Sequence, residues 1–215
     1  MIPDWPAERW QMVETQLRRR GIRDERVLAA MGEIPREEFV PLDLRVLAYR
    51  DEPVPIGFGQ TSSQPYMTAL MAQELCLSGS EKVLEVGAGC GYAAAVMALL
   101  VARVVTVEIV PQLVTFARTN LARTGRDSNI EVVDGDGSWG HLSQAPYDGI
   151  SVAAAAPDIP TALIEQLADH GRVVIPVGSL ADQELRVLTK RGSSIASRVA
   201  TTCRFVPLRG GEGWR

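Results

Sequence analysis

Short apolar runs alternate with helical segments along the chain from residue 66 onwards. The runs that indicate buried strands cover residues 82–86, 103–107, 130–133, 147–153 and 172–177. Helices are expected over residues 67–76, 92–100 and 160–168, and another is expected to start at Pro111. Further strand-like runs follow near residues 184–189, 195–201 and 203–206. Because strands that alternate with helices pair side by side in one sheet, this pattern predicts an α/β fold with a doubly wound, mainly parallel sheet.

The N-terminal part of the chain has a helical pattern without such strands. Apolar side chains between Trp10 and Leu17 recur at three- and four-residue steps, which predicts an amphipathic helix. Gly21 follows a basic run and is a suitable stop for that helix. Asp24 is placed to cap a second helix. We therefore expect a helical extension in front of the sheet.

Composition and charge exclude several classes of protein. Hydrophobic residues make up 46% of the 215 residues, which is typical of a folded globular protein. The length predicts a single domain over residues 1–215, with a helical extension (1–55) and an α/β core (56–215). The formal net charge of −4 argues against a protein that binds nucleic acid or anionic membranes. The longest apolar run, residues 92–102, is too short for a membrane-spanning helix.

Cysteine and histidine usage adds two expectations. The three cysteines are widely spaced and odd in number, so a disulfide framework is not expected and a reducing compartment fits best. No cysteine or histidine spacing suits a zinc site. The opening residues lack the pattern of a signal peptide. We expect a cytoplasmic monomer with no metal ion, no membrane and no nucleic acid among its partners.

A glycine-rich loop follows the first strand of the α/β core. The loop is Gly87-Ala88-Gly89-Cys90-Gly91, and Glu108 ends the next strand. In such a sheet, ligands bind beyond the carboxyl ends of the strands, and a carboxylate there can accept both hydroxyls of a ribose. The pattern indicates a nucleoside-containing cofactor. The alternative is that the glycines only make a tight turn and that Glu108 is an ordinary surface carboxylate.

The spacing of this loop narrows the choice of cofactor. A dinucleotide fingerprint would place a glycine where this chain has Tyr92, which disfavours a nicotinamide-dependent oxidoreductase. A P-loop would need Lys followed by Ser or Thr after the last glycine, and Tyr92 and Ala93 stand there instead. Glu85 would repel a phosphate but would suit a cationic ligand. These features favour S-adenosylmethionine, which carries an amino group and a sulfonium.

A polar loop precedes the cofactor-binding unit. Residues 51–64 are rich in proline and glycine, which predicts irregular structure. Residues 57–66, Gly-Phe-Gly-Gln-Thr-Ser-Ser-Gln-Pro-Tyr, offer hydroxyl and amide groups to which a substrate could bind. Spacing alone favours a plain surface loop here.

The sequence resembles the protein-L-isoaspartate O-methyltransferases from about Met12 to Leu208. The most specific match is the Gly-Gln-Thr-x-Ser-Gln-Pro segment that starts at Gly59. Further matching stretches are 16–17, 20–22, 34–37, 39–41, 55–57, 83–87, 135–137, 145–148, 175–178 and 205–208. The glycine-rich loop is shared with many methyltransferases, so it indicates the cofactor but not the substrate.

The resemblance implies a fold, an activity and a set of site residues. The fold is a Rossmann-like methyltransferase sheet with an N-terminal helical addition. The activity is transfer of the methyl of S-adenosylmethionine, leaving S-adenosylhomocysteine, to the free carboxylate of isoaspartyl residues in damaged proteins. The ester then closes to a succinimide, which can hydrolyse to normal aspartate, so the partners are isoaspartyl-containing proteins and peptides. The implied catalytic hydroxyl is that of Ser63, and the implied substrate contacts are Ser63, Gln64 and Pro65.

The resemblance also assigns the cofactor contacts residue by residue. Thr61, Ser62 and Tyr66 would cover the cofactor, and the remaining contacts would be Glu85, Gly87, Ala88, Gly89, Glu108, Ile109, Asp136 and Gly137. Of these, Glu85, Gly87 and Gly89 would form the loop at the methionine end, Glu108 would hold the ribose, and Asp136 with Gly137 would face the adenine.

Three points stay open at the level of sequence. Ser62 adjoins Ser63, so either hydroxyl could be the working group. The chain ends soon after Leu208, where longer family members continue and touch the cofactor. The alternative functions are a diverged relative that esterifies a normal aspartate of a dedicated peptide, and a binding protein that retains the fold without catalysis.

Overall fold

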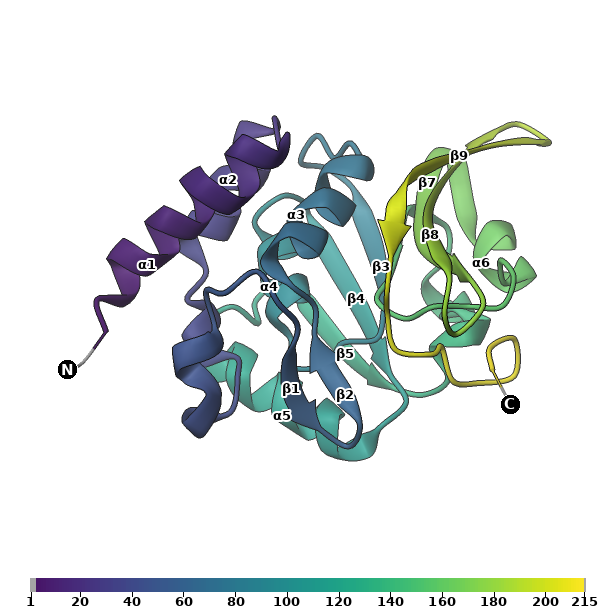
Figure 1. The fold of residues 1–215 in the computed structure, drawn as a ribbon. Coiled ribbons are helices and arrows are strands. Elements are labelled where there is room, and N and C mark those ends of the chain that lie inside the picture. The colour runs from purple at the N-terminus through teal and green to yellow at the C-terminus, as the bar shows by residue number, and fades with distance from the viewer. Residues whose placement is uncertain (1–2, 215) are drawn as a thin grey trace.

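A seven-stranded sheet forms the centre of the protein in a computed structural model, which describes residues 3–214 (Figure 1). Its order is β5-β4-β3-β6-β7-β8-β9. The strands are β3 (Lys82–Val86), β4 (Arg103–Glu108), β5 (Ile130–Asp134), β6 (Tyr147–Val152), β7 (Leu167–Gly178), β8 (Gln183–Arg191) and β9 (Ser194–Cys203). Strands β3 to β7 pair in parallel, whereas β8 and β9 are antiparallel to their neighbours. The expected doubly wound, mainly parallel sheet is confirmed.

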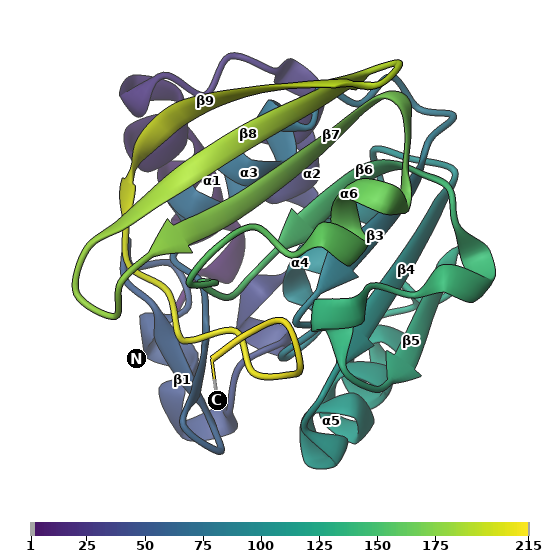
Figure 2. The ribbon, with the colours of Figure 1, turned by 90° about the vertical axis from the view of Figure 1, so that its right-hand side faces the viewer.

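Helices cover the sheet on two sides. The core helices are α3 (Pro65–Glu74), α4 (Tyr92–Ala98), α5 (Pro111–Arg123) and α6 (Thr161–Glu165). Short helical turns cover Arg36–Glu38, Leu42–Leu47, Gly137–Trp139 and Leu142–Gln144. In Figure 2, α1, α2 and α3 lie behind the strands and α6 lies in front of them. None of the helices in residues 3–214 has the length and apolarity that crossing a membrane requires.

One expected helix is much shorter than its sequence suggested. The prediction of a helix over residues 160–168 is confirmed only for residues 161–165, which form α6. The predicted end is wrong, because Leu167 already begins β7. Leu167 pairs there with Tyr147 of β6. The pairing partner comes from a distant part of the chain, so the local pattern could not reveal it.

The N-terminal extension is helical, as its pattern predicts. Helix α1 (Trp5–Gln11) continues through the helical turns of residues 12–20 and ends at Gly21, whose φ of 96° is left-handed. Helix α2 (Glu25–Glu33) begins after Asp24, whose side chain accepts hydrogen bonds from two backbone N–H groups of the first turn. Figure 1 shows both helices beside the sheet, on the side of α3.

Residues 51–64 are not an irregular loop, so that prediction is wrong. They contain a hairpin of β1 (Val54–Gly57) and β2 (Gln60–Ser62). Val54 and Ile56 of β1 are buried and the residues between and after them are exposed, which is the alternation of a strand with one buried face. The prolines and glycines that suggested irregularity lie at exposed positions of the strand and at its turn.

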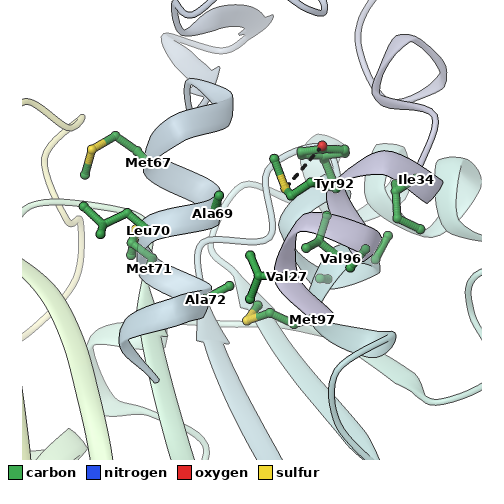
Figure 3. Close-up of a cluster of buried hydrophobic side chains, with 14 of the residues drawn as sticks. Val27, Ile34, Met67, Ala69, Leu70, Met71, Ala72, Tyr92, Val96 and Met97 are labelled. Atoms are coloured by element: carbon green, nitrogen blue, oxygen red, sulfur yellow. Dashed lines mark hydrogen bonds between the residues drawn. The ribbon is translucent and has the colours of Figure 1, made fainter. Parts of the chain in front are cut away.

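Two apolar clusters lie on the opposite faces of the sheet. Along β4, Val104 belongs to one cluster and Val105 to the other, as the two-residue period of a strand requires. The first cluster also contains side chains from the N-terminal extension. Figure 3 shows part of it, where Val27 of α2, Ala69 and Ala72 of α3, and Val96 and Met97 of α4 gather. This shared core supports the proposal that the extension and the sheet form one domain.

Candidate active site

The main cleft lies beyond the carboxyl ends of β3 and β4. Its empty space is about 790 Å³, a volume that includes the open mouth. Most of its lining comes from five stretches of the chain: residues 60–63, residues 85–90 with 92–93 around the glycine-rich loop, the end of β4 at 107–110, residues 153–154 after β6, and the C-terminal residues 206–209. Gly137 and Thr68 complete it. The cleft thus lies where ligands bind in open α/β sheets.

The glycine-rich loop turns sharply between β3 and α4. Gly87 and Gly91 adopt φ values of 96° and 87°, which side chains rarely tolerate. A Cβ on Gly91 would also lie 3.2 Å from a side-chain carbon of Leu121 in α5. These glycines let the backbone of the loop form one wall of the cleft directly.

Glu108 ties the end of β4 to this loop. Its Oε2 accepts a hydrogen bond from the backbone N–H of Gly89 at 2.9 Å, and its Oε1 accepts one from Val110 at 3.0 Å. The side chain is 5% exposed and lines the cleft. The reading of Glu108 as an ordinary surface carboxylate is therefore wrong.

Glu85 is a second carboxyl group in the wall, and it has no cationic partner among residues 3–214. It is 1% exposed, and its Oε2 accepts a 2.5 Å hydrogen bond from the hydroxyl of Thr106 on the neighbouring strand β4. Burial raises the pKa of Glu85 from its ordinary value of 4.5 to about 8, the Thr106 hydroxyl opposes this shift, and nearby Glu108 adds to it. With this pKa the group is mostly protonated at neutral pH, and a cation bound in the cleft would favour its ionised form.

The raised pKa of Glu85 predicts a pH-dependent stability. Below about pH 4.5 the group is protonated in both the folded and the unfolded state, but between about 4.5 and 8 the unfolded chain ionises first. The free energy of unfolding is therefore expected to fall across this range as pH rises. Glu85→Gln removes the titration, so its stability should exceed that of the parent at pH 8 and approach it at pH 4.5. Urea unfolding at several pH values measures this.

An exposed carboxylate provides the control for the pH experiment. Asp43 is exposed, and Asp43→Asn is expected to follow the parent curve at every pH. A parent and a Glu85→Gln variant whose stabilities change in parallel between pH 4.5 and 8 would contradict the assignment.

The polar segment 57–66, called here the hydroxyl-rich loop, contains β2 and leads into α3. Thr61, Ser62 and Ser63 all line the main cleft. Ser62 is 7% exposed and lies against the thiol of Cys90 in the glycine-rich loop. Ser63 lines the main cleft and also a smaller second pocket, whereas Ser62 lines only the first. The two neighbouring hydroxyls are thus in different environments.

The second pocket adjoins the main cleft. Four residues line both: Thr61, Ser63, Ala153 and Val206. The remaining lining of the second pocket is Pro53, Gln64, Met67, Arg204 and Phe205. Two ligands bound in the two spaces would meet at this shared wall.

Not every residue that the resemblance assigned to the site lines the cleft. Pro65 occupies the first turn of α3 and lines neither pocket. The Tyr66 ring lies under Arg20, whose guanidinium carbon is 3.6 Å from the ring centroid, and it lines neither pocket. Asp136 is also outside the lining, because its carboxylate accepts hydrogen bonds from the backbone N–H groups of Ser138 and Gly211. Gln64 lines only the second pocket.

The other assigned residues do line the main cleft: Thr61, Ser62, Ser63, Glu85, Gly87, Ala88, Gly89, Glu108, Ile109 and Gly137. Sequence reasoning missed Cys90, Tyr92, Ala153 and the C-terminal residues 206–209 as lining. The match of residues 205–208 to the family was the available signal for the last of these. Residues 206–209 line the cleft, so the C-terminal part of the chain lies where it could contact a ligand.

Comparison with known proteins points to one family. A family model described as Protein-L-isoaspartate(D-aspartate) O-methyltransferase (PCMT) matches residues 8–213. The protein-L-isoaspartate O-methyltransferase of Methanoregula boonei is 51% identical over 207 residues, which cover 96% of this chain and 95% of that protein. Protein-L-isoaspartate O-methyltransferase 2 of Marinobacter nauticus is 53% identical over 205 residues, which cover 94% of this chain and 93% of that protein.

A solved structure supports the same relationship. A protein-L-isoaspartate O-methyltransferase from Plasmodium falciparum, crystallised in complex with S-adenosyl-L-homocysteine, superposes with a TM-score of 0.81 at 28% identity. The match covers 94% of this chain and 98% of that one. On the full-length match of its sequence and its fold, the chain belongs to the protein-L-isoaspartate(D-aspartate) O-methyltransferase family.

Proposed function

We propose that this protein transfers the methyl group of S-adenosylmethionine to the free α-carboxylate of L-isoaspartyl residues in damaged proteins. The observation that carries the proposal is the position of Ser63 in the wall shared by the two pockets. The main cleft would hold the cofactor and the second pocket the isoaspartyl residue. Their shared wall is then where the methyl group and the carboxylate meet.

Two buried carboxyl groups fit the cofactor. Glu108 keeps both oxygens in the cleft wall, where each can accept a ribose hydroxyl in addition to its backbone N–H. Glu85 has no counter-ion in the described chain, and the ammonium of the methionine end would supply one. Ala88, Gly89 and Ile109 line the same cleft and would contact the cofactor through backbone and apolar atoms.

The proposed reaction needs few side chains. S-adenosylmethionine supplies an electrophilic methyl group on a sulfonium centre. A carboxylate is ionised at neutral pH, so no general base is required. The hydroxyl of Ser63 would donate a hydrogen bond to the attacking carboxylate and hold it in line with the methyl group. Such positioning can lower a barrier by up to about 7–11 kcal/mol.

The second pocket has features that suit an isoaspartyl peptide. Gln64 offers amide groups for the peptide backbone, and Met67 and Phe205 offer apolar contacts. Arg204 is exposed at this pocket and makes no ion pair within residues 3–214, so its charge is available to an anionic substrate. This charge would favour the approach of a carboxylate.

A pair of peptides tests the function directly. The protein is incubated with labelled S-adenosylmethionine and an isoaspartyl peptide, or with its aspartyl twin. We expect base-labile methyl ester on the isoaspartyl peptide and none on the twin. An isoaspartyl peptide whose α-carboxyl is amidated serves as a control and should stay unlabelled.

The other outcomes of this assay each have a meaning. Equal labelling of both peptides would favour the diverged relative that esterifies normal aspartate, and no labelling of either would contradict the proposal. The cytoplasmic location and the monomeric state stay predictions, and sedimentation of the purified protein would measure the second.

A further inference from the structure

Arg36 is a buried cation without an anionic partner in residues 3–214. It belongs to the helical turn Arg36–Glu38 of the N-terminal extension and is 0% exposed. The adjacent carboxylate of Glu37 is engaged elsewhere, by Arg9 and by the hydroxyl of Tyr49. Burial lowers the pKa of Arg36, as expected for a charge removed from water. An unpaired charge in a protein interior is destabilising, so a contribution to stability alone does not account for this residue.

The guanidinium of Arg36 connects the extension with the hydroxyl-rich loop. Its Nε donates a hydrogen bond to the carbonyl of Ala48 at 2.8 Å, and its Nη2 donates one to the carbonyl of Ser63, also at 2.8 Å. Its Nη1 is buried and has no hydrogen-bond partner in the described part of the chain. Both N–H groups belong to the same rigid, planar guanidinium and point in fixed directions. The two hydrogen bonds together therefore fix the distance between the backbone of Ala48 and that of Ser63.

An aromatic ring also fixes the orientation of this plane. The guanidinium carbon lies 4.7 Å from the centroid of the Tyr92 ring. Tyr92 is the first residue of α4, directly after the glycine-rich loop, and it lines the main cleft. Its hydroxyl contacts the sulfur of Met31 in α2 at 3.6 Å, one of the contacts drawn in Figure 3. Arg36 therefore contacts three segments: the extension, the hydroxyl-rich loop at Ser63, and the start of α4 at Tyr92.

We propose that Arg36 is a positioning residue that holds Ser63 at the shared wall of the two pockets, so that the N-terminal extension completes the active site. This inference rests on the proposed function. Arg36 does not line either pocket and acts through the backbone of Ser63. A shift of about 1 Å in a positioned group can lower a rate by about 100-fold, so the bond to the Ser63 carbonyl is where the effect would arise.

Two substitutions of Arg36 distinguish the effect of its hydrogen-bond geometry from the effect of its positive charge. Arg36→Lys keeps the cation but cannot donate in two fixed directions to both carbonyls. Arg36→Gln removes the buried charge as well as the pair of hydrogen bonds to Ala48 and Ser63. Because no unpaired charge is left in the interior, at least this variant is expected to fold. For both variants we expect kcat on the isoaspartyl peptide to fall by about 10- to 100-fold. The dissociation constant for S-adenosylhomocysteine should change by less than about three-fold, because the hydrogen bonds of Arg36 go to Ala48 and Ser63 and not to Glu85, Glu108 or Gly89.

Arg9→Met is the matched control. Arg9 also lies in the extension and donates to Tyr49, Glu33 and Glu37, but it reaches no residue of either pocket. Urea unfolding of all the variants reports any loss of stability. Arg9→Met is expected to lose stability and to keep its kcat.

Each result decides the inference. A fall of kcat in both Arg36 variants, with unchanged product binding and an active Arg9→Met, supports it. An active Arg36→Lys beside an inactive Arg36→Gln would mean that only the charge matters, and would overturn the positioning role. A kcat that tracks stability across all three variants would overturn it as well. An inactive parent protein would instead reject the proposed function, so the two failures are distinguishable.

Discussion

Ser63→Ala is expected to lower kcat on an isoaspartyl peptide by about 10- to 100-fold, since a hydrogen bond to a charged group contributes about 1.5–3 kcal/mol and about 1.4 kcal/mol is a factor of ten. Ser63 lies in the stretch of wall that also contains Thr61, Ala153 and Val206, where the two pockets meet. Steady-state kinetics with saturating S-adenosylmethionine measure the change. The dissociation constant for S-adenosylhomocysteine, measured by calorimetry, should stay within about two-fold.

The neighbouring serine provides the matched comparison. Ser62 lies against the thiol of Cys90 and lines only the main cleft. Ser62→Ala is expected to leave kcat within a few-fold of the parent. If Ser62→Ala proved the slower variant, the working hydroxyl would be that of Ser62, and the proposed position of the substrate would be wrong.

Glu108→Ala is expected to weaken cofactor binding by about 100-fold or more. The substitution removes charge-assisted hydrogen bonds to the ribose, each worth about 1.5–3 kcal/mol. It also removes the acceptor for the N–H groups of Gly89 and Val110, so the glycine-rich loop loses a restraint. Calorimetric titration with S-adenosylhomocysteine measures the effect. At saturating cofactor, kcat should change much less than the dissociation constant.

Asp134 is the matched carboxylate for this experiment. It pairs with Glu108 across the sheet, ends the adjacent strand β5, and is exposed outside the cleft. Asp134→Ala should bind the product as the parent does. Equal affinities of Glu108→Ala and the parent would show that the ribose lies elsewhere, and the cofactor pose proposed for the main cleft would then be rejected.

Most of the sheet could be predicted from the sequence, because the residue patterns that indicate its strands each lie within a few consecutive residues. The strands at 82–86 and 103–108 are short β-branched runs that end in glycine or a carboxylate, and parallel strands bring such ends to one edge. The hairpin at 54–62 was missed because its prolines and glycines suggest a loop when the buried partners of Val54 and Ile56 are unknown. The strand β7 was extended to Leu167 by a pairing partner 20 residues upstream, Tyr147.

The candidate site was also predicted only in part, because local patterns reveal strand ends but not contacts between distant segments. Glu108 and the glycine-rich loop follow from strand ends, but the second pocket forms where residues 53–67 meet residues 204–206, which are far apart in the chain. Asp136 and Tyr66 carry residue types that suit a ligand, yet their side chains bind Gly211 and Arg20 instead. No motif reports such competing contacts.

The amino-acid sequence alone determined most of the alternation of strands and helices in the α/β core and placed the glycine-rich loop and Glu108 at the ends of adjacent strands, because hydrophobic periodicity and glycine spacing act over a few residues. Tertiary structure alone decided which serine borders both pockets, that Glu85 is buried with no counter-ion among residues 3–214, and that Arg36 bridges the extension to Ser63. Burial and pairing depend on segments distant in the chain that pack together, and a pKa or a positioning contact exists only after that packing has excluded water.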